Sequence, residues 1–237
     1  LKCNQASNFT FNEFKFYNNS VCASFGGGAG IWLVFPSGDN DNLSYVDFTN
    51  CIFDQNQAIP RDASSNGNNY YGYGGGTTIA GSGQMKNIVY SLYNCDFQNN
   101  KAEYGGALCV ATNRECLIED CNFTRNSAQY GGAIYVRDQR VYDLTSGQVC
   151  PNLTISSCRF DSNESPKASS IYLLGDQHRP ANVYITNQCI FTTNIDYSKR
   201  DTSTLIWTKY KLLEITDIEF NFPDYQHSER AIYTDVE

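Results

Sequence analysis

The chain is poor in charge, in methionine and in histidine, and it has no long apolar run. Charged residues make up 18% of its 237 residues, and it contains one methionine and two histidines. This scarcity, together with abundant aromatic residues, is more typical of all-β surface proteins than of helical enzymes. The longest apolar run, Ile31 to Phe35, is far shorter than the roughly 20 residues of a membrane-spanning helix. We therefore expect little helix and no direct insertion into a membrane.

Basic residues are also few, which excludes one class of partner. Lys and Arg total 17 against 25 Asp and Glu, for a net charge of -8. Nucleic acids and anionic membrane surfaces require a basic protein surface, so neither is an expected partner. Cys-x-x-Cys motifs and clustered histidines are absent from the sequence, so no metal site and no cofactor is predicted. No nucleophile elbow or phosphate-binding loop is present either, so no catalytic residue is predicted.

Cysteine and asparagine, in contrast, are plentiful. Ten cysteines, an even number, suit an oxidising compartment outside the cell. Six Asn-X-Ser/Thr triplets without an intervening proline begin at Asn8, Asn18, Asn42, Asn122, Asn152 and Asn163. Such triplets are acceptors for N-linked glycans in secreted proteins. Together these features predict a secreted glycoprotein.

A repeated segment organises the chain. Cys95 to Val110 reads CDFQNNKAEYGGALCV, and Cys121 to Val136, 26 residues later, reads CNFTRNSAQYGGAIYV. Phe-x-x-Asn recurs along the chain, with its asparagine at positions 19, 56, 100, 126, 163 and 194. Apolar residues alternate before each copy, as in a strand, and a second apolar strand follows Gly-Gly-Ala. Each repeat is therefore predicted to be a strand, an Asn corner, a Gly corner and a strand.

Self-similarity at this short period predicts a solenoid. The expected fold is all-β, a parallel β-helix of about seven to eight coils in a single domain spanning residues 1–237. Longer spacings between repeats are assigned to loop insertions near 36–42, 58–73, 137–151, 175–180 and 197–202.

The pairing of Phe-x-x-Asn with Gly-Gly-Ala-Ile/Leu resembles the repeat of the chlamydial polymorphic outer membrane proteins and of related β-helical surface proteins of some protists. Residues 97–108 and 123–134 match both halves of this signature closely, and other repeats match one half. The resemblance implies a right-handed, single-stranded parallel β-helix at a cell surface, with adhesion as the associated role. The many sequons depart from the bacterial family and favour a eukaryotic relative.

A column of cysteines is expected, because a cysteine stands two residues before the Phe at positions 51, 95, 121, 158 and 189. Either stacked interior thiols or disulfides between coils would fit this spacing. The interior ladder is favoured because five cysteines cannot all pair among themselves. For the remaining cysteines we expect two disulfides, Cys3–Cys22 and Cys109–Cys150.

The column of asparagines should point inward and hydrogen-bond the backbone of neighbouring coils. Asn163 belongs to this column and Pro166 follows its triplet, so its sequon should be unused. Asn122 lies between the inward Cys121 and Phe123, so it should point outward. The expected glycan sites are Asn8, Asn18, Asn42, Asn122 and Asn152.

The candidate binding residues lie on the strand after Gly-Gly-Ala or its equivalent: Trp32, Tyr135, Tyr172 and Tyr233. Their neighbours in the sequence are expected to face inward, so these aromatic side chains should face outward, in register along the rod. An exposed aromatic stripe could stack on sugar rings or bury against a partner. The alternative is that loops cover the rings or that the rings stack on one another.

The first and last repeats show no amphipathic helix or polar cap, so we expect the ends to stack head-to-tail on another copy, forming a filament, or on a further domain. The predicted function is an extracellular structural or adhesive surface protein whose partners are itself, other surface proteins or glycans. A carbohydrate-binding module using the aromatic stripe is one alternative. The other is a polysaccharide lyase or hydrolase, because parallel β-helices include pectate lyases, although carboxylates are scattered among the repeats here.

Overall fold

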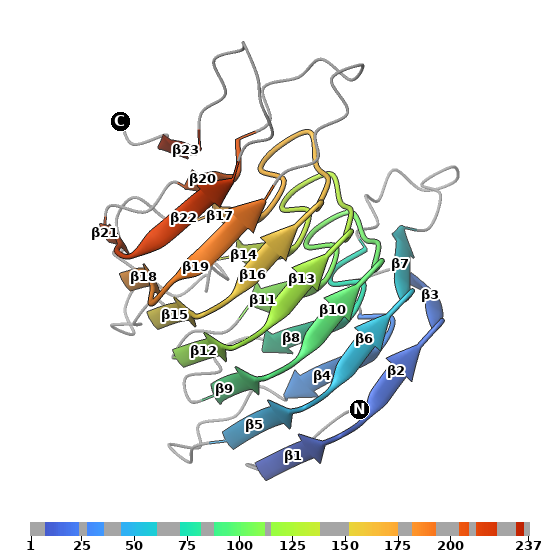
Figure 1. The fold of residues 1–237 in the computed structure, drawn as a ribbon. Helices are drawn as coiled ribbons and strands as arrows, with labels where there is room; N and C mark the ends of the chain where they lie inside the picture. Colours follow the sequence, from blue (N-terminus) through green and yellow to red (C-terminus); the bar gives the residue numbers. More distant parts are fainter. Residues whose placement is uncertain are drawn as a thin grey trace, which may run out of the picture.

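The computed structural model describes eleven segments of the chain: residues 8–23, 28–35, 44–60, 72–81, 88–111, 115–137, 152–174, 182–192, 204–208, 212–221 and 231–234. These segments form strands joined by turns. The strands run parallel and stack in chain order, from β1 and β2 at one end to β22 and β23 at the other (Figure 1).

Three parallel sheets of seven strands make up the structure. The first sheet contains β1 (Asn8–Asn12), β5 (Ser44–Thr49), β9 (Ile88–Tyr93), β12 (Glu115–Glu119), β15 (Asn152–Ser156), β18 (Asn182–Thr186) and β21 (Leu212–Ile215). The second contains β2 (Lys15–Tyr17), β6 (Ile52–Asp54), β10 (Asp96–Gln98), β13 (Asn122–Thr124), β16 (Arg159–Asp161), β19 (Cys189–Thr192) and β22 (Ile218–Asn221). The third contains β4 (Ile31–Phe35), β8 (Thr77–Gly81), β11 (Leu108–Ala111), β14 (Ile134–Arg137), β17 (Ile171–Leu174), β20 (Ile206–Thr208) and β23 (Ile232–Thr234). A small sheet pairs β3 (Ser20–Ala23) with β7 (Gln57–Pro60).

Each coil takes one strand from each large sheet, and equivalent residues of successive repeats are neighbours. Phe97, for example, pairs in register with Phe53 of the preceding coil and with Phe123 of the following coil. Seven coils stack in this way in the described segments. The expected all-β parallel β-helix is therefore confirmed.

Each coil has one strand more than the sequence pattern predicted. This additional strand is centred on the phenylalanine of the repeat, belongs to the second sheet, and stands where only a corner was expected. Asp96–Gln98 is such a strand, and a sharp bend lies on each side of it. Asn94 (φ 50°) bends the chain before Cys95, and Asn99 (φ 53°) bends it before Asn100. The left-handed conformation thus falls on the residue before the column asparagine, which leaves the column side chain free to point inward.

The core is a continuous stack of inward side chains. Residues predicted to point inward from the first sheet, such as Val46, Phe48 and Ile118, are completely buried. The phenylalanines of the second sheet stack ring on ring, with successive centroids 4.6 to 5.4 Å apart, in the order Phe16, Phe53, Phe97, Phe123, Phe160, Phe191 and Phe220. Because the five rings from Phe53 to Phe191 are completely buried between neighbouring coils, no coil could be stable alone.

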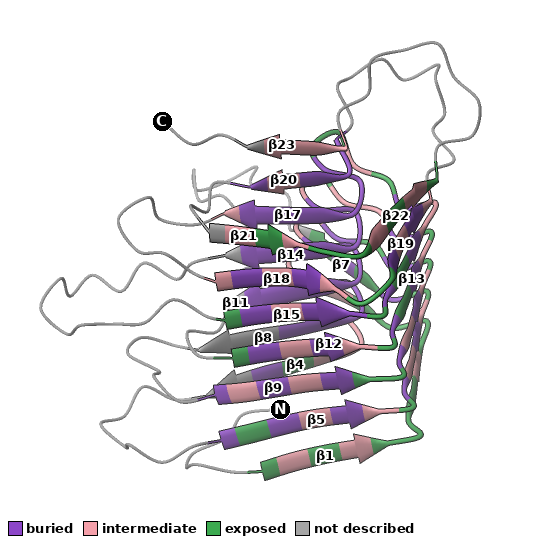
Figure 2. Cartoon of the chain, turned by 60° about the vertical axis from the view of Figure 1, so that its left-hand side comes forward, coloured by how far each residue is buried: buried purple, intermediate pink, exposed green. Residues whose placement is uncertain are grey.

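The first and last coils are less buried than those between them (Figure 2). Phe11 and Phe16 of the first coil are only partly buried, and so are Phe220 and Ile232 of the last coil. Phe14, which stands where later coils have the column cysteine, is 52% exposed. Among the described coils, each of these two has a neighbour on one side, whereas every coil between them has one on both sides.

The predicted loop insertions lie wholly or mostly outside the described segments. Those entirely outside are 36–42, 175–180 and 197–202. Of 58–73, Ala58 to Pro60 belong to β7, and of 137–151 only Arg137, the last residue of β14, is described. The assignment of one domain to the whole chain stays a prediction.

Candidate functional site

The predicted aromatic residues lie in one column along the outer side of the third sheet. The strand register orders this column as Trp32, Thr78, Cys109, Tyr135, Tyr172, Trp207 and Tyr233. The aromatic residues are in register along the sheet, as predicted. Two members of the column, Thr78 and Cys109, are not aromatic. Sequence reasoning misses Trp207 because no Gly-Gly-Ala precedes its strand, but the pair Ile206-Trp207 repeats the pair Ile31-Trp32 and is a usable signal.

The column is not an exposed stripe, so that expectation is wrong. Tyr135 is 3% exposed and Tyr172 is 7% exposed, whereas Trp32 is 38% exposed. Tyr233 is half-buried. The reason is that the rings pack on one another: Tyr172 stacks on Tyr135 at 5.7 Å and on Trp207 at 4.2 Å between ring centroids. Mutual stacking, the alternative weighed from the sequence, is the arrangement present.

A second row of aromatic rings, the tyrosine row Tyr73, Tyr104 and Tyr130, packs over this column. Each of its members precedes the glycine that turns the corner into the third sheet. Successive rings of the row are 5.1 and 4.9 Å apart. Tyr104 also packs edge-on against Tyr135, and Tyr130 packs edge-on against Tyr172. The tyrosine row therefore shields the middle of the column from solvent.

The middle of the column, from Cys109 to Trp207, and the tyrosine row form a hydrophobic cluster that is separate from the main core and also includes the buried Ala168. The Lys167 ammonium lies 5.1 Å from the centroid of the Tyr130 ring, a cation–π contact of about 0.5–1 kcal/mol at a partly exposed site. The rings of the tyrosine row are themselves half-buried. In the middle of the third sheet, the outer parts of the tyrosine row are therefore the part of this cluster that could meet a partner.

The column cysteines form the interior ladder favoured from the sequence. They are buried and make no disulfide in the structure: Cys51, Cys95, Cys121, Cys158 and Cys189. The Cys121 thiol donates to Glu119 O at 3.1 Å. Burial raises the pKa of the Cys121 thiol. Contact with the Cys158 thiol, together with burial, raises the pKa of Cys189. The five sulfur atoms are shut away from solvent, and buried structural cysteines of this kind do not react, so the ladder should be chemically inert.

We therefore expect an alkylating thiol reagent to leave the five ladder cysteines unmodified in the native protein and to modify all five after unfolding in guanidinium. Mass spectrometry of the labelled peptides would identify each site. Thr10, exposed on β1, supplies the control, because Thr10→Cys should be labelled at once in the native state. Labelling of native Cys121 as fast as that of Thr10→Cys would contradict the prediction.

The two predicted disulfides each involve a residue outside the described segments, Cys3 in one pair and Cys150 in the other. Their predicted partners are described. Cys22 is exposed on β3, and Cys109 is buried beneath the tyrosine row. Both disulfides stay predictions. The remaining cysteine, Cys116, is buried in the main core, where desolvation raises its pKa.

The column asparagines from Asn19 to Asn163 form a hydrogen-bonded ladder inside the corner, as predicted. The sixth, Asn194, lies outside the described segments. Asn100 Nδ2 donates to Asn126 Oδ1 at 3.0 Å, and Asn126 Nδ2 donates to Asn163 Oδ1 at 3.0 Å. Asn126 Nδ2 also donates to Phe97 O at 2.9 Å. Asn126 Oδ1 accepts a further bond from the backbone N–H of Asn100 at 3.0 Å. Each interior amide thus joins three successive coils, which accounts for an asparagine at this position.

A second asparagine ladder, which sequence reasoning misses, lies on the surface at the first bend. Asn94 Nδ2 donates to Asn50 Oδ1 at 2.7 Å, and Asn50 Nδ2 donates to Asn12 Oδ1 at 3.4 Å. The Asn-Cys pairs at 50–51 and 94–95 are its signal in the sequence. This outer ladder joins Asn12, Asn50 and Asn94 in the first three described coils, and the coil after them has Asp120 at the same bend.

The asparagines of the described sequons are exposed at the expected glycan sites and buried at Asn163. Four of the expected glycan sites are exposed, namely Asn8, Asn18, Asn122 and Asn152. The fifth, Asn42, lies outside the described segments. Asn122 Nδ2 donates to Asp96 Oδ1 at 2.8 Å, which leaves its second N–H for a sugar. Asn163 is 8% exposed, and its Nδ2 donates to Phe123 O at 2.8 Å.

In folded protein secreted from a eukaryotic host, we expect a glycan on Asn122 and none on Asn163, because a sugar on Asn163 would break the interior ladder. Glycopeptide mass spectrometry measures both sites. Thr124→Ala, which removes the Asn122 sequon, should lower the mass by one glycan, whereas Ser165→Ala, which removes the Asn163 sequon, should not. A glycan on Asn163 in the folded fraction would refute the assignment.

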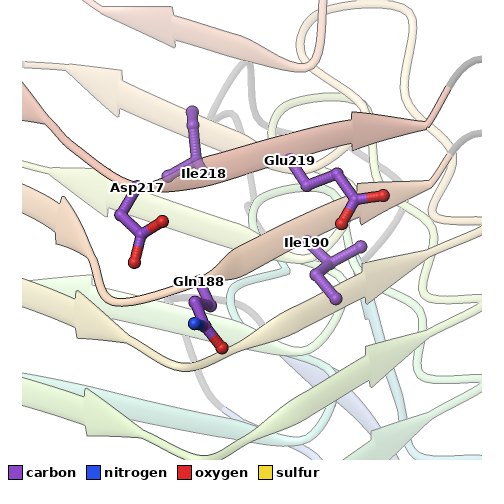
Figure 3. A pocket seen from close by; sticks show the side chains of 5 residues that line it. All are labelled: Gln188, Ile190, Asp217, Ile218 and Glu219. Atoms are coloured by element: carbon purple, nitrogen blue, oxygen red, sulfur yellow. The ribbon is translucent and has the colours of Figure 1, made fainter.

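A hollow beside the last coils is the other candidate site. It is lined by Gln188, Ile190, Asp217, Ile218 and Glu219, which come from β19, β22 and the bends before them (Figure 3). The Gln188 amide and the two carboxylates are exposed to solvent. Catalysis by paired carboxylates depends on a site that excludes water and shifts one of their pKa values, and exposed groups lack that environment. A polysaccharide lyase or hydrolase stays a prediction.

In the segments that the structure describes, no group of three or more His, Cys, Asp or Glu side chains is arranged to hold a metal ion. The two histidines, His178 and His227, lie outside those segments. The described part of the chain also contains no helix that is long and apolar enough to cross a membrane.

Residues 94–111 and 120–137 match the Chlamydia polymorphic membrane protein repeat. The matched segments are the two adjacent repeats that contribute Tyr104 and Tyr130 to the tyrosine row. The match agrees with the resemblance found in the sequence and points to a protein of the cell surface or outer membrane. Comparison with curated proteins and with solved structures gave no match.

Proposed function

We propose that this protein is an extracellular structural or adhesive glycoprotein displayed at a cell surface. The observation that carries the proposal is the match of two adjacent repeats to a membrane-protein repeat, within a fold whose seven coils repeat one geometry. The exposed sequons add support, because glycans are attached to proteins that enter the secretory route.

The interior of the rod suits a mechanical role. Successive coils are joined by the stacked phenylalanines and by the asparagine ladder, whose amide groups are buried. Opening one coil would expose these rings and leave buried amide groups without partners, which costs far more than opening a loop. The resulting rod is a rigid support that can hold other surface components at a fixed spacing.

Labelling of intact producing cells with a membrane-impermeant biotin reagent tests the location. We expect biotin on surface lysines such as Lys15 and Lys101, which are exposed, and loss of the labelled protein after brief protease treatment of the cells. Beads coated with the purified chain should bind such cells if the role is adhesive. Labelling that appears only after lysis would overturn the proposal.

A glycan-binding role is the second candidate, and the exposure of Trp32 (38%) is the observation that favours it. Binding on a glycan array should then be lost in Trp32→Ala. Tyr135 was part of the predicted stripe, but it is buried beneath Tyr104, so Tyr135→Ala would report on packing rather than on contact with a sugar. No binding by the wild-type protein would remove this candidate.

A further inference from the structure

We propose that Tyr104 and Tyr130, which lie on neighbouring coils of the tyrosine row, are a site of oxidative cross-linking, at which a peroxidase and hydrogen peroxide join the two rings into a dityrosine. The observation that carries this inference is the placement of two half-buried phenol rings in register and face to face. The inference goes beyond the proposed function, and its test uses the purified chain alone.

The backbone holds the two tyrosines together. Tyr104 and Tyr130 are paired by a parallel bridge at the corner before the third sheet. Their ring centroids are 4.9 Å apart, and the ring planes differ by 5°. The Gly105 N–H donates to Tyr130 O at 2.9 Å, and the Tyr130 N–H donates to Glu103 O at 3.1 Å. These hydrogen bonds lie on both sides of the pair, so the two side chains stay neighbours.

The covalent geometry of a dityrosine suits this placement. The link joins Cε, the carbon beside the phenol oxygen, of one ring to Cε of the other. Equivalent residues on neighbouring strands are about 4.8 Å apart, which is close to the distance that such a link sets between the two Cγ atoms. A quarter turn of both rings about the Cβ–Cγ bond, a torsion with broad minima, points a Cε of each ring at the other. The rings then lie edge to edge, and the backbone keeps its place.

The reaction balances with hydrogen peroxide as the oxidant and a haem peroxidase as the catalyst, because haem supplies the one-electron steps. Each phenol gives up one electron and its O–H proton and becomes a phenoxyl radical, whose unpaired electron is shared with Cε. The two radicals form one Cε–Cε bond, and the hydrogen on each of these carbons then moves to the phenol oxygen of its own ring. The protein loses two hydrogen atoms, and one hydrogen peroxide is reduced to two water molecules.

Two other groups of stacked rings in the described segments each lack one requirement of this reaction. The phenylalanines of the main core, such as Phe97 and Phe123, stack as closely but have no phenol group. Tyr135 and Tyr172 stack at 5.7 Å between ring centroids, but they are only 3% and 7% exposed, which keeps an oxidant away from them. The tyrosine row combines phenol groups, close stacking and access to solvent.

The cross-link would fasten two coils of the rod covalently. It would close a loop from Tyr104 to Tyr130, 26 residues along the chain. A closed loop has fewer conformations in the unfolded chain, so the folded state is favoured. The cross-linked protein should therefore unfold at a higher urea concentration than the untreated protein.

Treatment of the folded, purified chain with hydrogen peroxide and a small haem peptide tests the site. Trypsin places Tyr104 and Tyr130 in separate peptides, residues 102–114 and 126–137. Mass spectrometry should find these peptides joined, two hydrogen atoms lighter than their sum, with the link on Tyr104 and Tyr130. The yield should not depend on protein concentration, because both rings belong to one molecule.

Tyr130→Phe and Tyr93→Phe form a matched pair of variants. Each removes one phenol oxygen and keeps the ring, and circular dichroism would verify that both are folded. Tyr130→Phe should abolish the link. Tyr93→Phe should leave its yield unchanged, because Tyr93 is 47% exposed but pairs in register with Thr49 and Glu119 rather than with a tyrosine.

Three results would overturn the proposal: no joined peptides under conditions that oxidise Tyr93, a link that forms only between molecules, or equal yields in Tyr130→Phe and Tyr93→Phe. None of these results bears on surface labelling of intact cells, so failure of this inference and failure of the proposed function can be told apart.

Discussion

Asn126→Ala should unfold the middle of the rod. The Asn126 amide makes four hydrogen bonds inside the corner, to Asn100, Asn163 and Phe97 O. Alanine would leave the buried backbone N–H of Asn100 without its acceptor, at about 1–3 kcal/mol, and would remove one hydrogen bond each from Asn100 Nδ2, Asn163 Oδ1 and Phe97 O, at about 1 kcal/mol for each bond. We expect a loss of at least about 4 kcal/mol of stability, a large part of the 5–15 kcal/mol typical of a folded domain. Urea denaturation followed by circular dichroism measures it.

The matched control is Asn122→Ala, four residues earlier in the same coil. Asn122 is exposed and makes one surface hydrogen bond, to Asp96, so its loss should cost less than about 0.5 kcal/mol. Asn126→Asp tells the loss of hydrogen bonds apart from the loss of side-chain volume. It keeps the shape of the side chain but replaces the donor Nδ2 with an oxygen, so that two acceptors face each other at Asn163 Oδ1. It should destabilise the rod as much as alanine does. A change below about 1 kcal/mol in Asn126→Ala would show that the ladder is dispensable.

The second large effect is expected at the glycine corner. A Cβ on Gly106 would lie 2.2 Å from Gly132 O and 2.6 Å from Ser127 N, and both atoms belong to the backbone of the next coil. Neither atom can move without separating two coils that are joined through all three sheets. Gly106→Ala should therefore cost about 3 kcal/mol or more, and thermal unfolding would measure the loss.

Ser169→Ala provides the matched control for the corner, because Ser169 takes the place of Gly106 two coils later. Its side chain is buried, and its hydroxyl has no hydrogen-bond partner in the structure. Removing that hydroxyl should leave stability unchanged or raise it by up to about 1 kcal/mol. If Gly106→Ala proves as harmless as Ser169→Ala, the corner is not the close contact that the geometry indicates.

The repeat itself determined most of the fold. The alternation before each cysteine, the phenylalanine, the asparagine and the Gly-Gly-Ala each mark a position that faces the interior or turns a corner, so the sequence alone predicted the parallel β-helix, the thiol ladder and the asparagine ladder. These predictions succeeded because each depends on which way a side chain points within its own coil. Strand alternation decides that locally. The short strand of the second sheet was not predicted, because three residues between two bends are too few to show the alternation of apolar and polar side chains that marks a strand.

Tertiary structure decided what covers each surface. The sequence placed Tyr135 and Tyr172 on the outside of the third sheet, and they do point away from the main core, yet they are buried. The tyrosine row that covers them stands before the corner, about five residues earlier in each repeat, and reaches them only once the chain has turned. The direction of a side chain is a property of its own strand. Its exposure depends on residues that the fold brings beside it, and only the stacked coils show which residues those are.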